Sequence, residues 1–403
     1  MTHPNHPRSP AKKLLPFIEW LKGYNARSLR SDAVAGLTVA VVLIPQAMAY
    51  AMLAGLPPVY GLYAASVTPW IAALWGSLRQ LGTGPIAITS LLVLTTLTPM
   101  AEPGSERFVE MAVLLAHLVG LIYLLVGIFR MGQVMSFISH SAVKGFTSAA
   151  ALIITATQLP HLFGMDVGRH EYIFPMLLEI FKGLGSIQPY TAVIGVFSFV
   201  VIYGLKRMNP KMPAGLIALA VTASGVYLLN LHESGVVVIG NIPGGLPRPR
   251  LPLFDMDIGF SLIGPAVVIA LVSFAETYSV SKAISSQTKQ KVGVDQEFIG
   301  QGLANLIGSF FQCYPVAGSF SRTAINYSAG AKTGISSVVA SVLVVTALLF
   351  LTPLLTFIPR AALAALVISA VLLLFHPKEV LALWKLNRHD GVVAMTVFVL
   401  ALV

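Results

Sequence analysis

Charged residues are scarce in this 403-residue chain, where they make up only 10% of the sequence. Soluble globular domains carry roughly 25%, so the composition excludes an ordinary water-soluble enzyme. Cysteine is nearly absent as well, and Cys313 alone excludes an internal disulfide and a cysteine metal site. The nine histidines show no ligand spacing, and no nucleophile is paired with a base. We therefore expect no metal, no cofactor and no catalytic site.

Hydrophobic residues, by contrast, make up 56% of the chain and gather in long runs. These runs approach the roughly 20 residues that a helix needs to cross a bilayer. The pattern predicts an all-α polytopic membrane protein with about thirteen spans. The apolar segments are residues 34–55, 61–76, 85–99, 108–129, 142–159, 190–205 and 213–229, followed by 262–281, 297–312, 319–329, 335–353, 360–375 and 390–403. The last run stops at Val403 in mid-span, and we expect a fourteenth span to follow it.

Positive charge predicts how these spans are oriented. The sequence has 26 Lys and Arg against 16 Asp and Glu, a formal net charge of +10. The basic residues are scattered through short connections and not clustered on a soluble module, so nucleic acid is not an expected partner. Short cytoplasmic loops carry such an excess, and basic residues are frequent before the first span. We expect residues 1–33 to be a cytoplasmic N-terminal segment.

Two predicted spans are interrupted where they begin. The third begins with Gly82-Thr83-Gly84-Pro85 and the tenth with Pro315-Val316-Ala317-Gly318-Ser319, and each holds the third place in its half of the chain. Paired, broken segments of this kind are typical of inverted repeats that place a binding site at the bilayer midplane. We predict a 7+7 inverted-repeat transporter fold. Its parts are a first repeat over residues 34–230, an extracytoplasmic linker over 231–261 and an incomplete second repeat over 262–403.

Two half-helix N-termini that face each other would attract an anion. Each leaves N–H groups unpaired and carries about half a positive elementary charge. Pro85 suits a first helical turn because it has no N–H, Ser319 suits an N-cap, and Gly318 permits close approach. Arg322 falls in the first turn of the second half-helix and adds a full positive charge. An unpaired Arg in hydrocarbon costs at least ~3 kcal/mol, so it needs an anion, a carboxylate or water.

Glu276 is the candidate carboxylate, because an acid within an otherwise apolar span is a functional hypothesis by default. Gln46 and Tyr50 lie one turn apart in the first span. The first and eighth spans are predicted repeat equivalents, so Gln46 and Glu276 are expected to flank the site. Two plainer interpretations stay open. Glu276 and Arg322 could form a buried structural pair, and Gln46 could hydrogen-bond to a neighbouring helix.

Five sequence motifs follow one another along the chain, namely Ile44–Ala51 with Ala54–Tyr63, Gly84–Ala87, Ile242–Pro247, Gly302–Phe311 and Gly318–Arg322. In this order they resemble the sulfate permease (SulP) family of anion transporters. The resemblance implies an elevator-type transporter with a core domain (spans one to four and eight to eleven) and a gate domain (five to seven and twelve to fourteen). It also implies a homodimer in the plasma (bacterial inner) membrane and a cytoplasmic STAS domain after the last span.

The resemblance also implies which residues contact the substrate. By position these are Gln46, Tyr50, Ile86, Phe320 and Ser321, together with the half-helix backbone around Gly84, Pro85, Ala87, Gly318, Ser319 and Arg322. Many animal relatives have Phe where this chain has Ile86, so aromatic lining is lost there. Relatives carry sulfate, bicarbonate, chloride, iodide, oxalate or dicarboxylates, and the family alone does not choose among them.

Charge counting favours a divalent anion. Two half-helix termini supply about +1 together and Arg322 another +1, while an ionised Glu276 would cancel one of these. We therefore expect proton-coupled sulfate uptake, with Glu276 as the coupling acid and the anion held between the third and tenth spans. Sodium-coupled bicarbonate transport, dicarboxylate transport and a non-transporting anion sensor stay open as alternatives.

Overall fold

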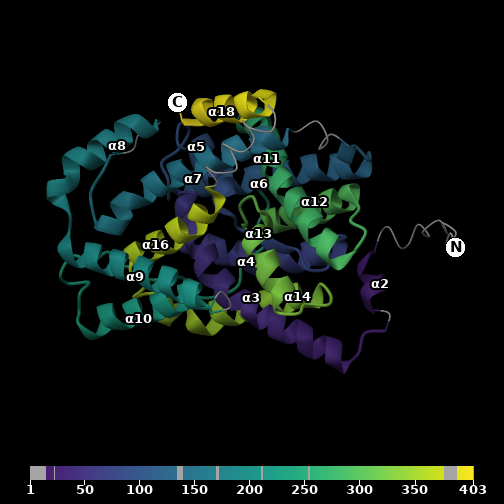
Figure 1. The fold of residues 1–403 in the computed structure, drawn as a ribbon, viewed down its shortest axis with the longest axis horizontal. Coiled ribbons are helices and arrows are strands. Elements are labelled where there is room, and N and C mark those ends of the chain that lie inside the picture. The colour runs from purple at the N-terminus through teal and green to yellow at the C-terminus, as the bar shows by residue number, and fades with distance from the viewer. Residues whose placement is uncertain are drawn as a thin grey trace, which may run out of the picture.

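The structure is a computed structural model that describes residues 15–21, 23–133, 139–168, 172–209, 212–252, 255–375 and 388–402. The described chain is mainly helical (Figure 1). Its longer helices are α3 (Ala26–Leu53), α4 (Pro58–Trp75), α6 (Glu106–Ile128), α7 (His140–Phe163), α9 (Pro189–Met208), α11 (Met256–Thr288) and α12 (Val294–Phe310). Residues 1–14 and 22 of the predicted N-terminal segment lie outside the described part.

The remaining helices are shorter than the thickness of a bilayer requires. They are α2 (Phe17–Leu21), α5 (Ala87–Leu97), α8 (Ile173–Lys182), α10 (Ala214–Leu228), α13 (Phe320–Ser328), α14 (Ile335–Thr346), α15 (Thr352–Leu355), α16 (Arg360–Val371) and α18 (Arg388–Leu402). Three single turns join some of them, η2 (Gly183–Ser186), the π-helical η3 (Ala347–Leu351) and η4 (Leu372–Leu374). The π-helical turn makes α14, η3 and α15 one continuous span of 21 residues.

Six helices in the described part of the chain are long and apolar enough to cross a membrane. They correspond to six of the thirteen expected apolar runs, and several extend beyond the run that predicted them. The first span begins at Ala26, eight residues before the apolar run at 34, because Asn25 accepts a hydrogen bond from the backbone N–H of Ser28 and caps the helix there. The amphipathic helix α8 was not predicted, because ten residues are too few for a span.

Small residues set the closest helix contacts. A Cβ on Gly120 of α6 would lie 2.5 Å from the Leu306 backbone nitrogen of α12, and one on Gly302 would lie 2.9 Å from the Leu124 nitrogen. Without side chains at these two positions the backbones of α6 and α12 approach directly, as is common in membrane helix pairs. The α6–α12 contact is the most extensive helix contact in the described chain.

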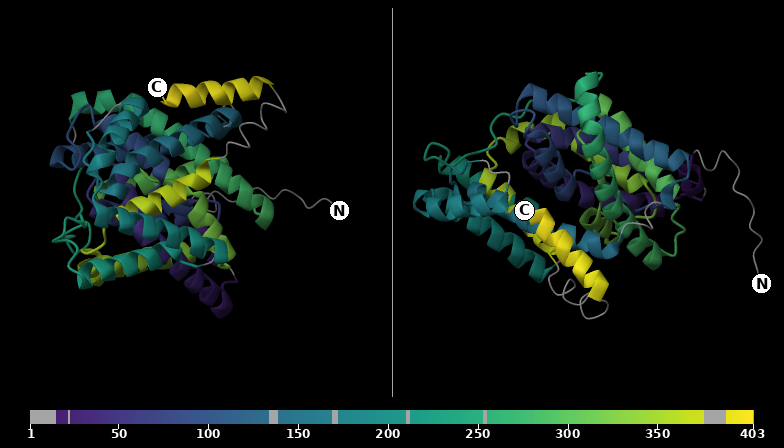
Figure 2. Two further views of the ribbon diagram at one scale, coloured as in Figure 1. Left: turned by 60° about the vertical axis from the view of Figure 1, so that its left-hand side comes forward. Right: turned by 90° about the horizontal axis from the view of Figure 1, so that it is seen from above.

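The helices form two groups with α3 between them (Figures 1 and 2). Helices α7, α9, α10 and α16 pack against one another on one side, and α4, α6, α11 and α12 pack on the other. Two hydrophobic clusters hold the helices together, and α3 and α4 contribute to both. One joins them to α5, α7, α10, α14 and α16, and the second joins them to α6, α11 and α12. The short helices α5 and α13 both contact α3 and α11, and α5 also contacts α6 and α7.

Candidate anion-binding site

The two interrupted segments meet at their N-terminal ends. Residues Gly82–Gly84 form strand β1 and Ala317–Ser319 form strand β2, and the two strands pair antiparallel with Thr83 opposite Gly318. Helix α5 starts three residues after β1, and α13 starts directly after β2. The pairing holds the positive ends of two short helices against each other. We did not expect strands here, because three-residue strands have no readable periodicity.

The helix starts differ from the expectation in one respect. Pro85 does not lie in the first turn of α5, because Ile86 is the N-cap and the helix begins at Ala87. The reason is the extended backbone at Ile86, with φ −133° and ψ 151°, which continues from β1. Ile86 provides no side-chain cap, so the first N–H groups of α5 keep their partial positive charge for a ligand. At α13, Ser319 is the N-cap as predicted and accepts from the Arg322 backbone N–H at 3.5 Å.

Arg322 is fully buried between the two half-helices. Its Nη1 donates to the backbone oxygen of Pro85 at 2.8 Å, which ties α13 to the other interrupted segment. Its Nε and Nη2 have no hydrogen-bond partner within the described residues. A buried guanidinium with two open donors is costly until an acceptor arrives. Arg322 is therefore anchored on one edge and available to an oxyanion on another.

Glycines make room for this arginine. Gly84 has φ +145°, a conformation that L side chains rarely adopt, and a Cβ there would lie 3.4 Å from Nη2 of Arg322. A Cβ on Gly82 would lie 2.8 Å from the Arg322 Cβ. The first interrupted segment thus needs glycine at position 84 for its backbone conformation and at position 82 for the close approach of Arg322.

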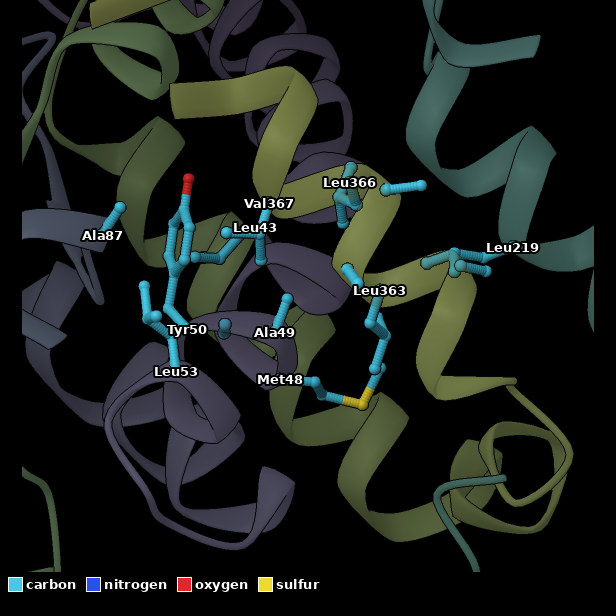
Figure 3. Close-up of a cluster of buried hydrophobic side chains, with 14 of the residues drawn as sticks. Leu43, Met48, Ala49, Tyr50, Leu53, Ala87, Leu219, Leu363, Leu366 and Val367 are labelled. Carbon is cyan, nitrogen blue, oxygen red and sulfur yellow. The ribbon is translucent and has the colours of Figure 1, made fainter. Parts of the chain in front are cut away.

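Gln46 and Tyr50 lie one turn apart on α3 and both carry polar atoms. Both side chains are 6% exposed, and Gln46 Oε1 has no partner among the described residues. Tyr50 lies beside Ala87 at the start of α5 (Figure 3), and it acts electrostatically on Arg322. The Oε1 of Gln46 therefore makes no helix-to-helix hydrogen bond within the described residues, and the role of its amide as a donor stays a prediction.

Glu276 also faces this region. Its side chain is half-buried, its Oε2 is buried without a partner in the described chain, and it interacts electrostatically with Arg322. A closed structural ion pair would satisfy both groups, yet Oε2 of Glu276 and Nη2 of Arg322 are both left open. The carboxyl is therefore near the arginine without neutralising it through these atoms.

Helix α11 holds both half-helices on either side of Glu276. The hydroxyls of Ser273 and Thr89 of α5 share a hydrogen bond of 2.6 Å. One turn later, Thr277 Oγ1 accepts from the Gly318 backbone N–H of β2 at 2.9 Å. Along the helix, Glu276 thus lies between the two residues that bond the interrupted segments.

The other predicted contacts divide into two sets. Ile86 and Ala87 are buried, at 3% and 5% exposure. Phe320 is 53% exposed and Ser321 is half-buried, with its hydroxyl 3.3 Å from that of Ser319. The α5 side of the site is thus enclosed, whereas the α13 side is open where Phe320 lies.

Three buried polar residues of α12 support the site, and the sequence analysis missed them. Glu297 Oε1 accepts from both the Ser77 N–H and the Leu78 N–H, before β1. Gln301 Nε2 donates to Thr83 Oγ1 of β1 at 2.8 Å. Asn305 bonds both the N–H and the C=O of Val316, directly before β2.

The spacing of Glu297, Gln301 and Asn305 is one helical turn each, so one face of α12 contacts both interrupted segments. Polar residues at i, i+4 and i+8 in an otherwise apolar span were the signal that could have identified them. We refer to these three residues as the α12 polar face.

Two discontinuous helices around a buried cation are typical of polytopic helical membrane transporters, and this is the class of protein to which the fold and the site belong. The chain belongs to the sulfate permease family, whose sequence model matches residues 29–397. This confirms the resemblance seen in the motifs. The family is one of transporters and not of enzymes.

Several named relatives are sulfate transporters. "Sulfate transporter 4.1, chloroplastic" of Arabidopsis thaliana is 37% identical over 94% of this chain and 56% of its own length. The "Sodium-independent sulfate anion transporter" of Bos taurus is 35% identical over 94% of this chain and 67% of its own. This chain therefore spans little more than half of the Arabidopsis relative.

Solved structures share the fold. The chain matches "The overall structure of SLC26A9" with a TM-score of 0.91 at 24% identity, over 97% of this chain and 65% of that one. It matches "The transmembrane domain of a cyanobacterium bicarbonate transporter BicA" with a TM-score of 0.83 at 22% identity, over 94% and 96% of the two chains. These likenesses confirm the predicted helical membrane fold.

Proposed function

We propose that the protein is a secondary active transporter of sulfate or a similar inorganic oxyanion, bound between the N-termini of α5 and α13. The observation that carries the proposal is Arg322, which is fully buried, tied by Nη1 and open at Nε and Nη2. Two parallel N–H donors of a guanidinium match two oxygens of an oxyanion. The uncapped start of α5 and the hydroxyl of Tyr50 supply further donors at the same place.

Sulfate is the favoured anion because the site supplies about two positive charges, one from the guanidinium and about one from two helix termini. Relatives named as sulfate transporters add support. An ionised Glu276 would cancel one of these positive charges. The site therefore balances the two negative charges of sulfate only when Glu276 carries a proton. On this basis uptake is proton-coupled, with Glu276 as the coupling acid.

The two helix groups on either side of α3 suit an elevator mechanism, in which the group that carries α5 and α13 slides against the group of α7, α9, α10 and α16. We place the protein in the plasma membrane with its N-terminus in the cytoplasm, from the distribution of Lys and Arg. A homodimer belongs to the same proposal. The 7+7 inverted repeat with the proposed domain limits stays a prediction.

Sulfate uptake into proteoliposomes tests the proposal. The wild type should accumulate labelled sulfate when the outside is more acidic, with or without sodium. Glu276→Gln should keep sulfate exchange and lose its response to the pH gradient, because the neutral amide can no longer take up or release a proton. The exposed Glu106→Gln is the matched control and should behave as wild type.

The same assay separates the alternatives. Unchanged gradient-driven accumulation in Glu276→Gln refutes proton coupling through this residue. A strict requirement for sodium indicates a sodium-coupled carrier. If bicarbonate or a dicarboxylate inhibits the uptake of labelled sulfate more strongly than unlabelled sulfate does, that anion is the substrate. Binding of sulfate with no exchange and no accumulation indicates an anion sensor.

A further inference from the structure

A cavity of about 420 Å³ lies away from the half-helix site, between the two helix groups. Its walls come from the end of α3 and the turn after it, the end of α7, the segment before α11 and the start of α16. The polar side chains among the lining residues are Gln158, His161, Asn241 and Arg360. Within the described part of the chain the lining contains no aspartate or glutamate, so the fixed charge of the cavity is positive.

We propose that this cavity is a second, weaker anion site, at which a hydrated oxyanion is recruited before it reaches the site between α5 and α13. The inference rests on the proposed function, because it concerns the path of the same anion. The name "recruitment site" refers below to the cavity around Asn241 and Arg360.

The recruitment site has a fixed cation. Arg360 is the first residue of α16, and its backbone N–H donates to the oxygen of Val237 at 3.0 Å, while Pro359 pairs with Val238 in an isolated bridge. These contacts fix the base of the side chain, whose exposed head lines the cavity. His161 lies within electrostatic range of Arg360. A volume of about 420 Å³ exceeds the ≈ 30 Å³ share of one water about fourteenfold, so an anion can keep much of its hydration.

The floor of the cavity is apolar and separates it from the half-helix site. Ala49, Leu363 and Val367 line it and are at most 2% exposed. They belong to the cluster that joins α3 to α16 (Figure 3). Tyr50, the residue after Ala49, faces α5 on the other side of this contact.

A charged solute does not cross such a packed apolar layer while it stays closed, because it would lose its hydration without gaining partners. An anion that enters the cavity in this conformation therefore stays in the cavity, separated from the half-helix site by this apolar layer. It can reach the half-helix site only when the two helix groups move apart. This is the reason for assigning recruitment, and not transport itself, to the cavity.

A charge series at Asn241 tests the inference, because Asn241 is exposed in a loop and tolerates substitution more readily than a helix residue. Initial rates of sulfate uptake by cells are measured against concentration. Asn241→Lys should lower the KM and Asn241→Asp should raise it, each about threefold to fivefold at low salt, with little change in the maximal rate. Arg360→Gln should raise the KM in the same way.

The ionic-strength dependence is the second readout. Between about 0.01 M and about 0.15 M salt the Debye length falls from about 30 Å to about 8 Å, so differences in KM within the series should shrink. Arg250→Gln is the matched control: it removes an exposed arginine that does not line the cavity and should leave the KM near that of the wild type.

Two results overturn the inference. Equal KM values for Asn241→Lys, wild type and Asn241→Asp exclude an anion at this position, whether or not Arg360→Gln folds. Equal effects of Arg250→Gln and Arg360→Gln show a general surface field and no site. A wild type that takes up no anion refutes the proposed function itself, whereas an active wild type with a flat charge series refutes the recruitment site alone.

Discussion

Asn305 gives the most direct test of how the site is held. Its amide donates to the backbone oxygens of Gln301, at 2.9 Å, and Val316, at 3.0 Å, and its oxygen accepts from the Val316 N–H at 2.9 Å. Val316 is fully buried directly before β2. Asn305→Ala leaves both backbone groups of Val316 without these partners.

A buried backbone group left unpaired costs about 1–3 kcal/mol, so two groups predict a loss of about 2–6 kcal/mol. The substitution should lower the melting temperature in detergent by several degrees. Because Val316 leads directly into β2, the start of α13 should also lose its place opposite α5. We expect sulfate affinity to fall at least tenfold in the protein that remains folded, measured by uptake KM at a temperature well below melting.

Ser198→Ala is the control for Asn305→Ala. Ser198 is fully buried but donates only to Ile194 of its own helix, at 2.7 Å. It should cost about 1 kcal/mol or less and leave the KM unchanged. The reasoning is refuted if Asn305→Ala melts and transports like the wild type, or if it lowers stability as expected while the KM stays the same.

Three further predictions concern other parts of the structure. Gly84→Ala should cost about 1–3 kcal/mol through its backbone conformation and strongly lower sulfate uptake by shifting the β1 backbone beside Arg322; a normal uptake rate would contradict the need for glycine. Glu297→Gln should stay folded with a near-normal KM, because the amide oxygen can accept the same hydrogen bonds from the Ser77 and Leu78 N–H groups as Oε1 does. Glu297→Ala loses this acceptor and should melt several degrees lower. Burial and the hydrogen bond to Asp32 raise the pKa of Tyr24 to about 12. The stability that this bond adds is complete below pH 10 and lost as the pH rises toward 12, so the melting temperatures of wild type and Tyr24→Phe should converge there.

The helical membrane fold could be predicted from the sequence, because the bilayer requires apolar runs that are long enough to cross it. The interruption at Gly84 and Gly318 was also readable, since glycine and proline break a helix in any surroundings. The N-cap role of Ser319 followed from residue type. Pro85 was placed wrongly because the extended backbone of Ile86 depends on pairing with β2.

The pairing of β1 with β2 could not be predicted from the sequence. It joins Thr83 to Gly318, more than two hundred residues away, and three-residue strands carry no pattern. The exposure of Phe320 likewise depends on which helices cover α13. The α12 polar face was within reach of the sequence, because Glu297, Gln301 and Asn305 repeat every four residues, but its partners were not.

If Glu276 is the coupling acid, as proposed above, its position on α11 lets one proton act on the whole site without a large movement. Ser273, one turn earlier, is bonded to α5, and Thr277, the next residue, is bonded to β2. A change of charge at Glu276 therefore occurs at a fixed place between the two half-helices and near Arg322. Because the interior screens charges weakly, the proton alters the potential at the guanidinium directly. In the proposed mechanism, anion affinity and proton occupancy are thus coupled through charge, and the proposed sliding of the two helix groups follows from that coupling.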